Sequence, residues 1–149
     1  MKNLKSLAIE PTGKMEVTDA AGEVQHQEDG VTPMTITVHS PGTKVYQKAL
    51  HDFNAKSKGG LSALINGKDD KRDADADTRD LAVFLAAVTI SFDGFDYEGK
   101  TGNAQFRAAY EDLEIGHIAE NLNKFLGKRG NFLKAPPTTS SDSSASQPG

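Results

Sequence analysis

The chain has 149 residues, a formal net charge of −4 and no cysteine, and 36% of its residues are hydrophobic. This length is enough for one ordinary domain with a real core; the lack of cysteine excludes disulfides and thiolate metal sites, and the negative charge argues against a general nucleic-acid-binding protein. The N-terminus lacks the continuous apolar stretch of a signal peptide, and the longest apolar run, at 81–88, falls far short of the roughly 20 residues that cross a bilayer, so we expect a soluble cytoplasmic protein.

Two stretches near the N-terminus alternate between apolar and polar residues. They are residues 14–18, KMEVT, and residues 34–39, MTITVH. This alternation is typical of strands that bury one face. A turn at 19–22 and a polar loop that ends at Gly30 separate them. We expect the two strands to pair antiparallel, and the long connection leaves their register open.

A helix start follows the second strand. Ser40-Pro41 combines a capping side chain with a proline at the first helical position. The apolar residues after it are spaced i, i+3, i+4 and i+7: Tyr46, Ala49, Leu50 and Phe53. This spacing predicts a helix over 41–57 that ends near Lys58-Gly59-Gly60.

Residues 66–80 carry six aspartates against two lysines and two arginines. Such a density of charge without apolar residues predicts a solvated loop beside the next helix. A calcium loop is the alternative, because Asp73, Asp75 and Asp77 alternate. An EF-hand loop needs a central glycine and a terminal bidentate glutamate, and both are missing here, so we expect no metal.

A nearly unbroken apolar run follows at 81–90. Its alanines, and Thr78 as a cap before it, favour a buried helix over a buried strand. A helix that is apolar nearly all round needs cover on several sides. We therefore place it at the centre of the core, packed by the 41–57 helix and by a later helix at 115–126. Residues 91–99 are expected to form a loop or short strand whose three aromatic side chains fold back on that core: Phe92, Phe95 and Tyr97.

The stretch 101–133 is predicted to form a helical hairpin. Thr101 is the expected N-cap of its first helix, on which Phe106, Ala109 and Tyr110 share a face. The second helix has an apolar stripe followed for three turns: Ile115, Ile118, Ala119, Leu122, Phe125 and Leu126. Gly127 and Gly130 offer left-handed positions at which it can stop. A short apolar tag, Phe132-Leu133, comes after the stop.

These elements predict an α+β fold, with a small N-terminal antiparallel β-hairpin or sheet followed by a mainly helical core of about four helices. We assign residues 1–134 to a single globular domain. Residues 135–149 hold three prolines, five serines and no large apolar residue. A segment of this composition cannot bury enough surface to offset its ordering entropy, so we expect a disordered tail.

The chain carries no recognisable catalytic motif. Its four histidines are scattered over different predicted elements: His26, His39, His51 and His117. His39 is expected on the wet face of its strand and His117 on the polar side of its helix. A phosphate-binding loop, a dinucleotide fingerprint and a nucleophile elbow are all missing from the sequence. We therefore expect a protein that is not an enzyme and that uses no cofactor or metal.

Binding is the remaining chemistry, and one segment stands out for it. Residues 121–134 hold four basic residues and no acidic one, next to apolar side chains. A basic rim around apolar anchors suits an acidic, amphipathic partner helix; the alternative is an ordinary helix C-terminus whose charges match the helix dipole. The candidate protein-binding residues are Lys124, Phe125, Lys128, Arg129, Phe132 and Leu133.

Several motifs resemble one known family. Phe106-x-x-x-Tyr110 is followed by Gly116-His117-Ile118, an amphipathic helix and Gly130-Asn131-Phe132-Leu133. This pattern resembles the tail assembly chaperones of long-tailed siphophages or of related prophages. Residues 7–23, 34–49 and 81–102 resemble the same family, so the likeness covers most of 7–133. None of these motifs is catalytic.

The resemblance implies a function. Members of that family are small non-enzymatic proteins of the infected host's cytoplasm that coat the tape measure protein, keep it soluble and help recruit tail tube protein. They are absent from the mature virion, their short form tends to self-associate, and a programmed frameshift often yields a longer form. The resemblance thus implies tape measure protein, tail tube protein and further copies of the chain as partners, with no nucleic acid and no membrane. The alternative is a structural virion component, such as a small head–tail connector or a tube-associated protein.

Overall fold

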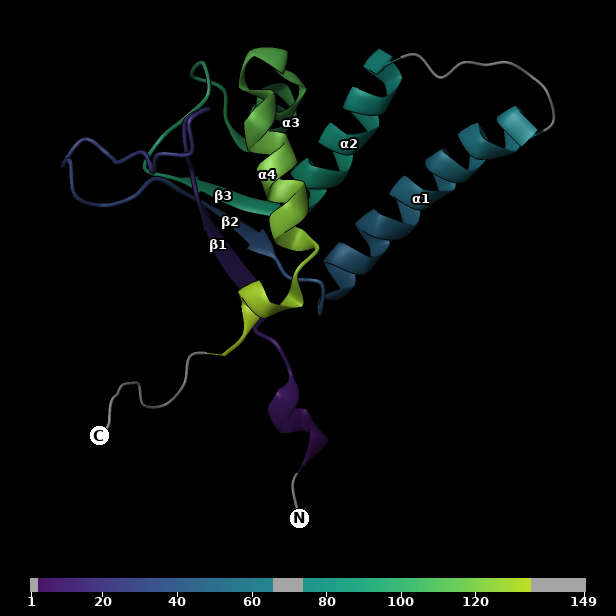
Figure 1. Ribbon diagram of the computed structural model, residues 1–149, viewed down its shortest axis with the longest axis horizontal. Coiled ribbons are helices and arrows are strands. Elements are labelled where there is room, and N and C mark those ends of the chain that lie inside the picture. The colour runs from purple at the N-terminus through teal and green to yellow at the C-terminus, as the bar shows by residue number, and fades with distance from the viewer. Residues whose placement is uncertain (1–2, 66–73, 135–149) are drawn as a thin grey trace.

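The computed structural model describes residues 3–65 and 74–134, and Figure 1 shows their arrangement. The described chain combines α-helices with a three-stranded antiparallel sheet, which confirms the expected α+β class. Along the chain the elements are the 3₁₀ turn η1 (Leu4–Leu7), the strands β1 (Thr12–Glu16) and β2 (Thr35–His39), the helices α1 (Lys44–Ile65) and α2 (Ala74–Val88), the strand β3 (Thr89–Asp93), the helix α3 (Gly102–Glu111), the turn η2 (Leu113–Ile115), the helix α4 (Gly116–Leu126) and the turn η3 (Arg129–Phe132).

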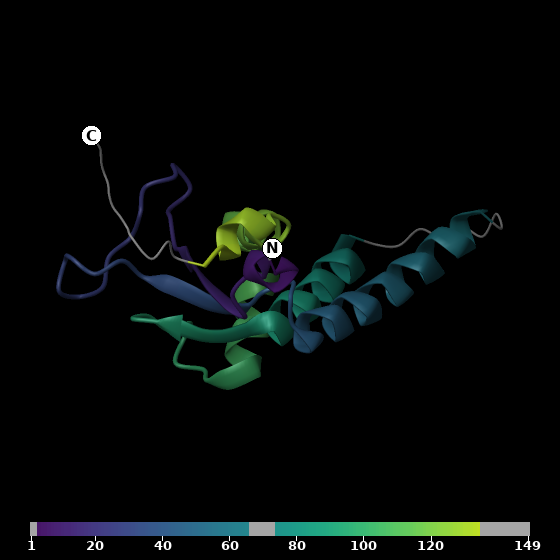
Figure 2. The same ribbon diagram turned by 90° about the horizontal axis from the view of Figure 1, so that it is seen from below.

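The sheet has β2 at its centre and β1 and β3 at its edges. The predicted antiparallel pairing of the first two strands is confirmed, and Met15 lies opposite Ile36. The inner face buries Met15, Val17, Ile36 and Val38, as the apolar alternation requires. Figure 1 shows α3 and α4 on one side of the sheet, and the view from below in Figure 2 shows the three strands side by side.

The outer face of the sheet is polar and is organised around Asp93. This carboxylate accepts hydrogen bonds from the hydroxyls of Thr35 (2.9 Å), Thr37 (2.5 Å) and Ser91 (2.7 Å). The ammonium group of Lys14 lies 3.7 Å from it. Burial alone would raise the pKa of Asp93, but these hydrogen bonds and the Lys14 charge outweigh burial and hold the pKa below its usual value.

A β-bulge in β3 decides which side chains enter the core. Ser91 pairs with Thr37 and Thr89 pairs with Val38, which leaves Ile90 as an extra residue between two pairs of the described ladder. An extra residue exchanges the faces of the strand beyond it. As a result Phe92 faces the core beside Ile36, and Asp93 reaches the outer face.

The end of the predicted 81–90 helix is wrong by two residues. The helix α2 ends at Val88, and β3 begins at the next residue. Thr89 and Ile90 are β-branched and fit a strand better than a helix. The buried hydroxyl of Thr89 donates to the Leu85 carbonyl oxygen (2.7 Å) and lies 2.8 Å from the hydroxyl of Tyr110, which ties the junction to α3.

The predicted helix start at Ser40-Pro41 is also wrong, because α1 begins at Lys44. Ser40 is fully buried, and its N–H donates to the Pro11 carbonyl oxygen (2.8 Å), so it extends the β1–β2 ladder instead. Thr43 supplies the cap, since its hydroxyl oxygen accepts from the backbone N–H of Tyr46 (3.1 Å). Two residues that can both cap a helix lie close together here, and the sheet uses the first.

The far end of α1 and the start of α2 differ from the prediction as well. The helix α1 continues past Gly59-Gly60 to Ile65, since a glycine lowers helix stability by only about 1 kcal/mol. The helix α2 begins at Ala74, before Thr78, so the last part of the Asp-rich stretch is helical rather than loop. The rest of that loop prediction, at 66–73, lies outside the described residues, as does the predicted disordered tail at 135–149.

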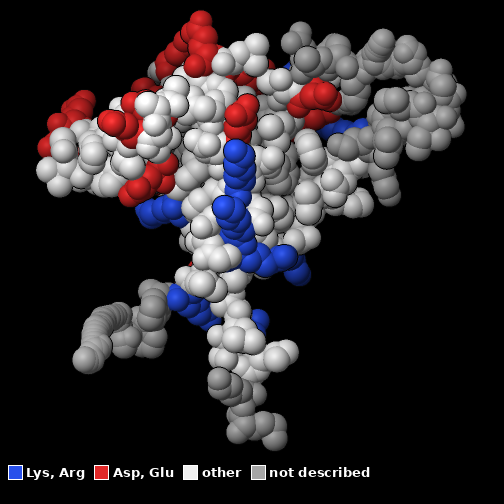
Figure 3. Space-filling view, in the orientation of Figure 1, with Lys and Arg blue, Asp and Glu red and all other residues white. Residues whose placement is uncertain are grey.

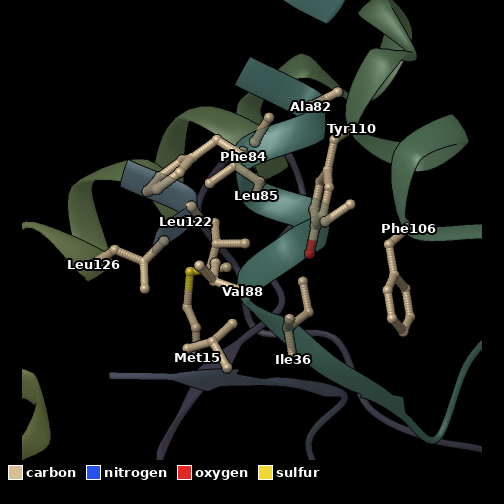
Figure 4. Packing of buried hydrophobic residues seen from close by; sticks show 14 of the residues in the cluster. Met15, Ile36, Ala82, Phe84, Leu85, Val88, Phe106, Tyr110, Leu122 and Leu126 are labelled. Atoms are coloured by element: carbon tan, nitrogen blue, oxygen red, sulfur yellow. The ribbon is translucent and has the colours of Figure 1, made fainter. Parts of the chain in front are cut away.

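The helix α2 is the centre of the core, as predicted. It packs mainly against α1 and α3 and makes a smaller contact with α4. Figure 4 shows Val88 of this helix meeting Met15 and Ile36 of the sheet, with Leu122 and Leu126 approaching from α4. Among the largest fully buried side chains are Ile36, Leu85, Val88, Leu122 and Leu126.

The helices α3 and α4 match the predicted hairpin, but their ends differ. Phe106, Ala109 and Tyr110 are buried on one face of α3 as expected. Thr101 occupies the N-cap position, yet its side chain makes no capping hydrogen bond within the described part of the chain. Gly127 ends α4 in a right-handed conformation (φ −75°). Gly130 lies inside η3, so the predicted left-handed stops are wrong.

Candidate functional site

The turn η3 places Phe132 in the core, which contradicts its prediction as an exposed binding anchor. Its side chain is only 1% exposed, and its ring packs edge-on to Phe125 with centroids 5.2 Å apart. The ring lies against Gly13 of β1 so closely that a Cβ at that glycine would be 2.5 Å from it. The Phe132 carbonyl oxygen accepts from the N–H of Glu10 (2.7 Å). The chain therefore folds back over β1 at a position where a glycine leaves room.

The other predicted binding residues separate into two groups. Leu133 is 67% exposed, beyond the last turn. Arg129 is exposed and lies near Tyr46: burial raises the pKa of that tyrosine, and the Arg129 charge opposes the shift. Lys124, Phe125 and Lys128 are brought together on one surface. The predicted site is thus divided. Phe132 lies in the core and Arg129 and Leu133 are exposed elsewhere, while the remaining three residues line a groove.

That groove, which we name the β1–α4 groove, has a volume of about 320 Å³. One wall comes from β1 and the residues after it, and the other from the second half of α4 and the turn that follows. Lys124 and Lys128 are exposed there, while Phe125 is half-buried against Phe132. Its lining residues are Met15, Glu16, Thr18, Asn121, Lys124, Phe125, Lys128 and Asn131.

The strand β1 offers its backbone to this groove. In the described sheet β1 has a neighbour on one side alone. The N–H of Val17 bonds to Met34 and the carbonyl of Pro11 bonds to Ser40, so the odd-numbered residues pair with β2. Because the bonds of an antiparallel strand alternate in direction, the N–H and C=O groups of Lys14 and Glu16 point away from the sheet. Among the described residues these groups have no backbone partner.

Charge is unevenly distributed around the groove. Figure 3 shows Lys and Arg side chains over the lower end of α4, while Asp and Glu side chains gather above and to the left. Lys124 and Lys128 line the groove, and Glu16 is the one acidic side chain among its lining residues. The local field therefore favours an acidic segment.

A second hollow lies at the other end of β1, and we name it the sheet-end cleft. It has a volume of about 330 Å³ and lies between the sheet, the 17–34 connection, the 94–97 loop and the start of α4. Its apolar lining is Val17, Met34, Ile36, Phe92, Phe95, Ala109, Ile115 and Ile118. Its rim is formed by the small side chain of Ala20 and by the polar residues Thr18, Asp19, Gln25, Asp96, Tyr97 and His117.

Two hydrogen bonds hold the rim of the sheet-end cleft. Nε2 of His117, which was predicted on the polar side of its helix, donates to the Thr18 carbonyl oxygen (3.0 Å), and this histidine is half-buried against a loop. The hydroxyl of Tyr97 donates to Asp112 (2.7 Å). That bond, with burial and the charges of Asp112, Glu98 and Glu114, raises the pKa of Tyr97 to about 12, so the phenol stays protonated at neutral pH.

Sequence reasoning did not find this cleft. It correctly predicted that Phe92 and Phe95 fold back on the core, and it placed Ile115 and Ile118 on the apolar stripe of a helix. It could not show that these side chains leave an open space between them. A hollow depends on distances between elements far apart in sequence, and periodicity carries no information on those distances.

Among the described residues there is no group of three or more side chains suited to hold a metal ion. Of the alternating aspartates considered for calcium, Asp73 lies outside the described residues, and Asp75 and Asp77 belong to α2. In the same part of the chain, no helix is long and apolar enough to cross a membrane.

No protein family, curated protein or solved structure was found to match this chain. Its function is therefore inferred from the shape, charge and free backbone groups of the β1–α4 groove, together with the sequence resemblance.

Proposed function

We propose that this protein is a non-enzymatic assembly chaperone of a long-tailed phage, which binds the tape measure protein in the host cytoplasm and keeps it soluble until the tail tube forms. The observation that carries the proposal is the β1–α4 groove, in which a free strand edge lies beside two lysines and an aromatic ring. Such a surface binds a segment of another chain without catalysing any reaction on that segment. The family resemblance of the sequence supplies the identity of the client.

The groove suits an extended, acidic segment of the client. An extended peptide adds to a free sheet edge through main-chain hydrogen bonds, which are the same for every sequence. Here the outward N–H and C=O groups of Lys14 and Glu16 supply them. Lys124 and Lys128 then favour carboxylates on the client, and the exposed edge of Phe125 contacts an apolar side chain. A holdase needs this combination, because it meets its client before the client has packed.

The free edge is also protected against indiscriminate pairing. Exposed edge strands tend to aggregate, and charged side chains on the edge reduce that tendency. Lys14 and Glu16 are both exposed on β1. The strand is also short, at five residues. A short, charged edge selects a partner that brings complementary charge with it.

Tail tube protein would be a further partner, and the chaperone would act only before the virion is complete. A longer, frameshifted form would bring the tail tube protein to the client. The chaperone would leave before the virion is complete, so mass spectrometry of purified virions should not find the chain. Its presence there in stoichiometric amounts would favour the alternative, a structural component such as a head–tail connector or tube-associated protein.

The test is co-expression with the tape measure protein, scored by the fraction of that client that stays soluble. Lys124→Glu with Lys128→Glu reverses the charge of the groove and should lower that fraction strongly. Lys44→Glu with Lys100→Glu changes the net charge equally at exposed positions outside the groove and should have little effect. Equal solubilisation by both double variants would contradict the groove assignment.

A backbone variant tests the strand edge separately. Proline in an edge strand removes one N–H and is tolerated where that N–H points to solvent. Lys14→Pro should therefore keep the β1–β2 ladder and the fold, since the N–H of residue 14 points away from β2. It should reduce client binding, whereas Lys14→Ala should retain it. Full client binding by a folded proline variant would rule out strand addition at β1.

A further inference from the structure

We propose that the N-terminal arm, residues 3–8, docks in the sheet-end cleft of a second copy of this chain, so that the protein assembles head to tail. This inference concerns a different surface from the β1–α4 groove and does not depend on the proposed client. It rests on an exposed apolar turn, an apolar cleft of opposite charge, and an anchor that prevents the arm from reaching its own cleft.

The arm presents two leucines to solvent in an ordered turn. Leu4 is 78% and Leu7 is 73% exposed, and no side chain of η1 is buried by the described residues. Side chains at i and i+3 of a 3₁₀ turn eclipse each other, so both leucines lie on one face. The side chain of Asn3 caps the turn by accepting from the N–H of Lys5 (3.0 Å). Figure 1 shows η1 extending below the rest of the domain.

The sheet-end cleft matches the arm in size. Its volume of about 330 Å³ lies at the lower end of the range for ligand sites in proteins. That space accommodates one or two aliphatic side chains but not a whole amphipathic helix. Its floor is apolar, with Phe92, Phe95 and Ile118 among the lining residues. Two leucines on one face of a single turn are an occupant of this size and chemistry.

Charge is complementary as well. Asp19 and Asp96 lie on the rim of the cleft, and no lysine or arginine is among its described lining residues. His117 on the same rim is occupied by its bond to Thr18. The described part of the arm carries Lys5 and no acidic residue. Docking thus brings a cation to an acidic rim.

The arm cannot fill the cleft of its own chain. Ile9 packs partly buried against the core and lies over Gly42, and the N–H of Glu10 is bonded to Phe132. Leu7 is two residues from this anchor and reaches at most about 7 Å beyond it. The cleft begins at Val17, on the far side of β1, whose five residues span about 17 Å. An arm that docks in such a cleft therefore docks in the cleft of another copy.

The proposed head-to-tail contact has a consequence for the size of the assembly. The arm and the cleft lie at opposite ends of β1, so the contact joins two different surfaces and leaves one arm and one cleft free on each pair. A contact of this type closes into a ring or continues as a filament. Two arms exchanged reciprocally would stop at a symmetric dimer instead, so a wild type that stops at a dimer would overturn the head-to-tail arrangement.

The experiment measures molar mass by sedimentation velocity over a wide range of concentrations of the full chain. The wild type should grow beyond a dimer as concentration rises. Leu4→Asp with Leu7→Asp disables the arm, and Ala20→Arg with Asp96→Lys obstructs the cleft at exposed rim positions. Each variant alone should remain monomeric. Leu133→Asp, which changes another exposed leucine, should assemble like the wild type.

Mixing the two double variants gives the decisive result. The arm variant retains its cleft and the cleft variant retains its arm, so an equimolar mixture should form a 1:1 dimer that does not grow. Circular dichroism and unfolding midpoints establish that each variant is folded. The proposal is overturned if the wild type stays monomeric, if either double variant assembles like the wild type, if the mixture stays monomeric, or if Leu133→Asp abolishes assembly as well.

Discussion

The turns η1 and η3, near the two ends of the described chain, have the same length and opposite surroundings. Each is a four-residue 3₁₀ turn. The turn η3 buries Phe132 in the core of the domain, whereas η1 leaves Leu4 and Leu7 in solvent. Both turns carry large apolar side chains, so hydrophobicity alone does not separate them. The difference is that η3 faces Gly13, where the missing side chain leaves a hole of the right shape.

A turn of this length contributes little stability of its own. The turn η3 is fixed because its phenylalanine removes apolar surface from water and because its backbone bonds to Glu10. The turn η1 is ordered by its Asn3 cap and gains nothing from the domain. One turn therefore belongs to the folded core, and the other is available for a contact between molecules.

The largest expected effect on stability comes from removing the Phe132 ring, which fills the space over Gly13. Phe132→Ala should lower the free energy of unfolding by about 3–5 kcal/mol, the usual range for a buried phenylalanine. Leu133→Ala, one residue away and exposed, should change it by less than about 0.5 kcal/mol. Urea unfolding followed by circular dichroism measures both. A loss of under about 1 kcal/mol for Phe132→Ala would mean that η3 is not part of the core.

Adding a side chain at Gly13, on the β1 side of this contact, should have the next largest effect on stability. Gly13→Ala places a methyl group within the space of the Phe132 ring and should destabilise by about 1–3 kcal/mol through overpacking. Gly116→Ala is the matched control, because nothing lies within 4 Å of a Cβ there. It should leave stability unchanged or raise it by up to about 1 kcal/mol. Similar midpoints for the two variants would contradict the close contact of Gly13 with Phe132.

A smaller effect is expected on the outer face of the sheet, where stabilisation is polar. The folded-state pKa of Asp93 lies below its ordinary value of 3.8, so its contribution is present above that pH and is lost as the pH falls through the folded-state pKa. The wild type should therefore exceed Asp93→Asn in stability near neutral pH and lose that advantage as the pH falls through the folded-state pKa of Asp93. Urea midpoints across this range measure the difference. A constant difference would mean that Asp93 does not titrate with folding.

The smallest effect on stability is expected for substitutions of the exposed leucines in η1. Leu4→Ser with Leu7→Ser should change the free energy of unfolding by less than about 0.5 kcal/mol, because neither side chain is buried. The measurement needs a low protein concentration, at which copies do not associate. Destabilisation by more than about 1 kcal/mol would place the two leucines against their own domain and remove the contrast with η3.

The same contrast explains what the sequence could predict. Apolar periodicity identified the inner residues of both N-terminal strands and the buried faces of α2, α3 and α4, since those patterns depend on neighbours a few positions apart. Leu85, Phe106 and Leu122 all lie in the core as expected. Phe132 was misplaced because its partner, Gly13, lies at the other end of the chain.

Other differences have the same origin. The bulge at Ile90 is set by pairing with β2, and the start of α1 is set by the bond between Ser40 and Pro11. Lys124, Phe125 and Lys128 line one groove because they share one helix end, while the strand edge opposite them could not be foreseen. Contacts between distant segments decide these features, and they leave little trace in a local pattern.

The junction between Val88 and Thr89, where α2 becomes β3 without an intervening residue, limits how this chain can change length. An insertion within the end of α2 would rotate the rest of that helix by about 100°. An insertion after Thr89 would exchange the faces of β3 and turn Phe92 outward. The register of β3 is therefore linked to the end of the central helix, because no loop residue separates them. Insertions and deletions should be tolerated least at this joint and most readily in the exposed bend at 28–32.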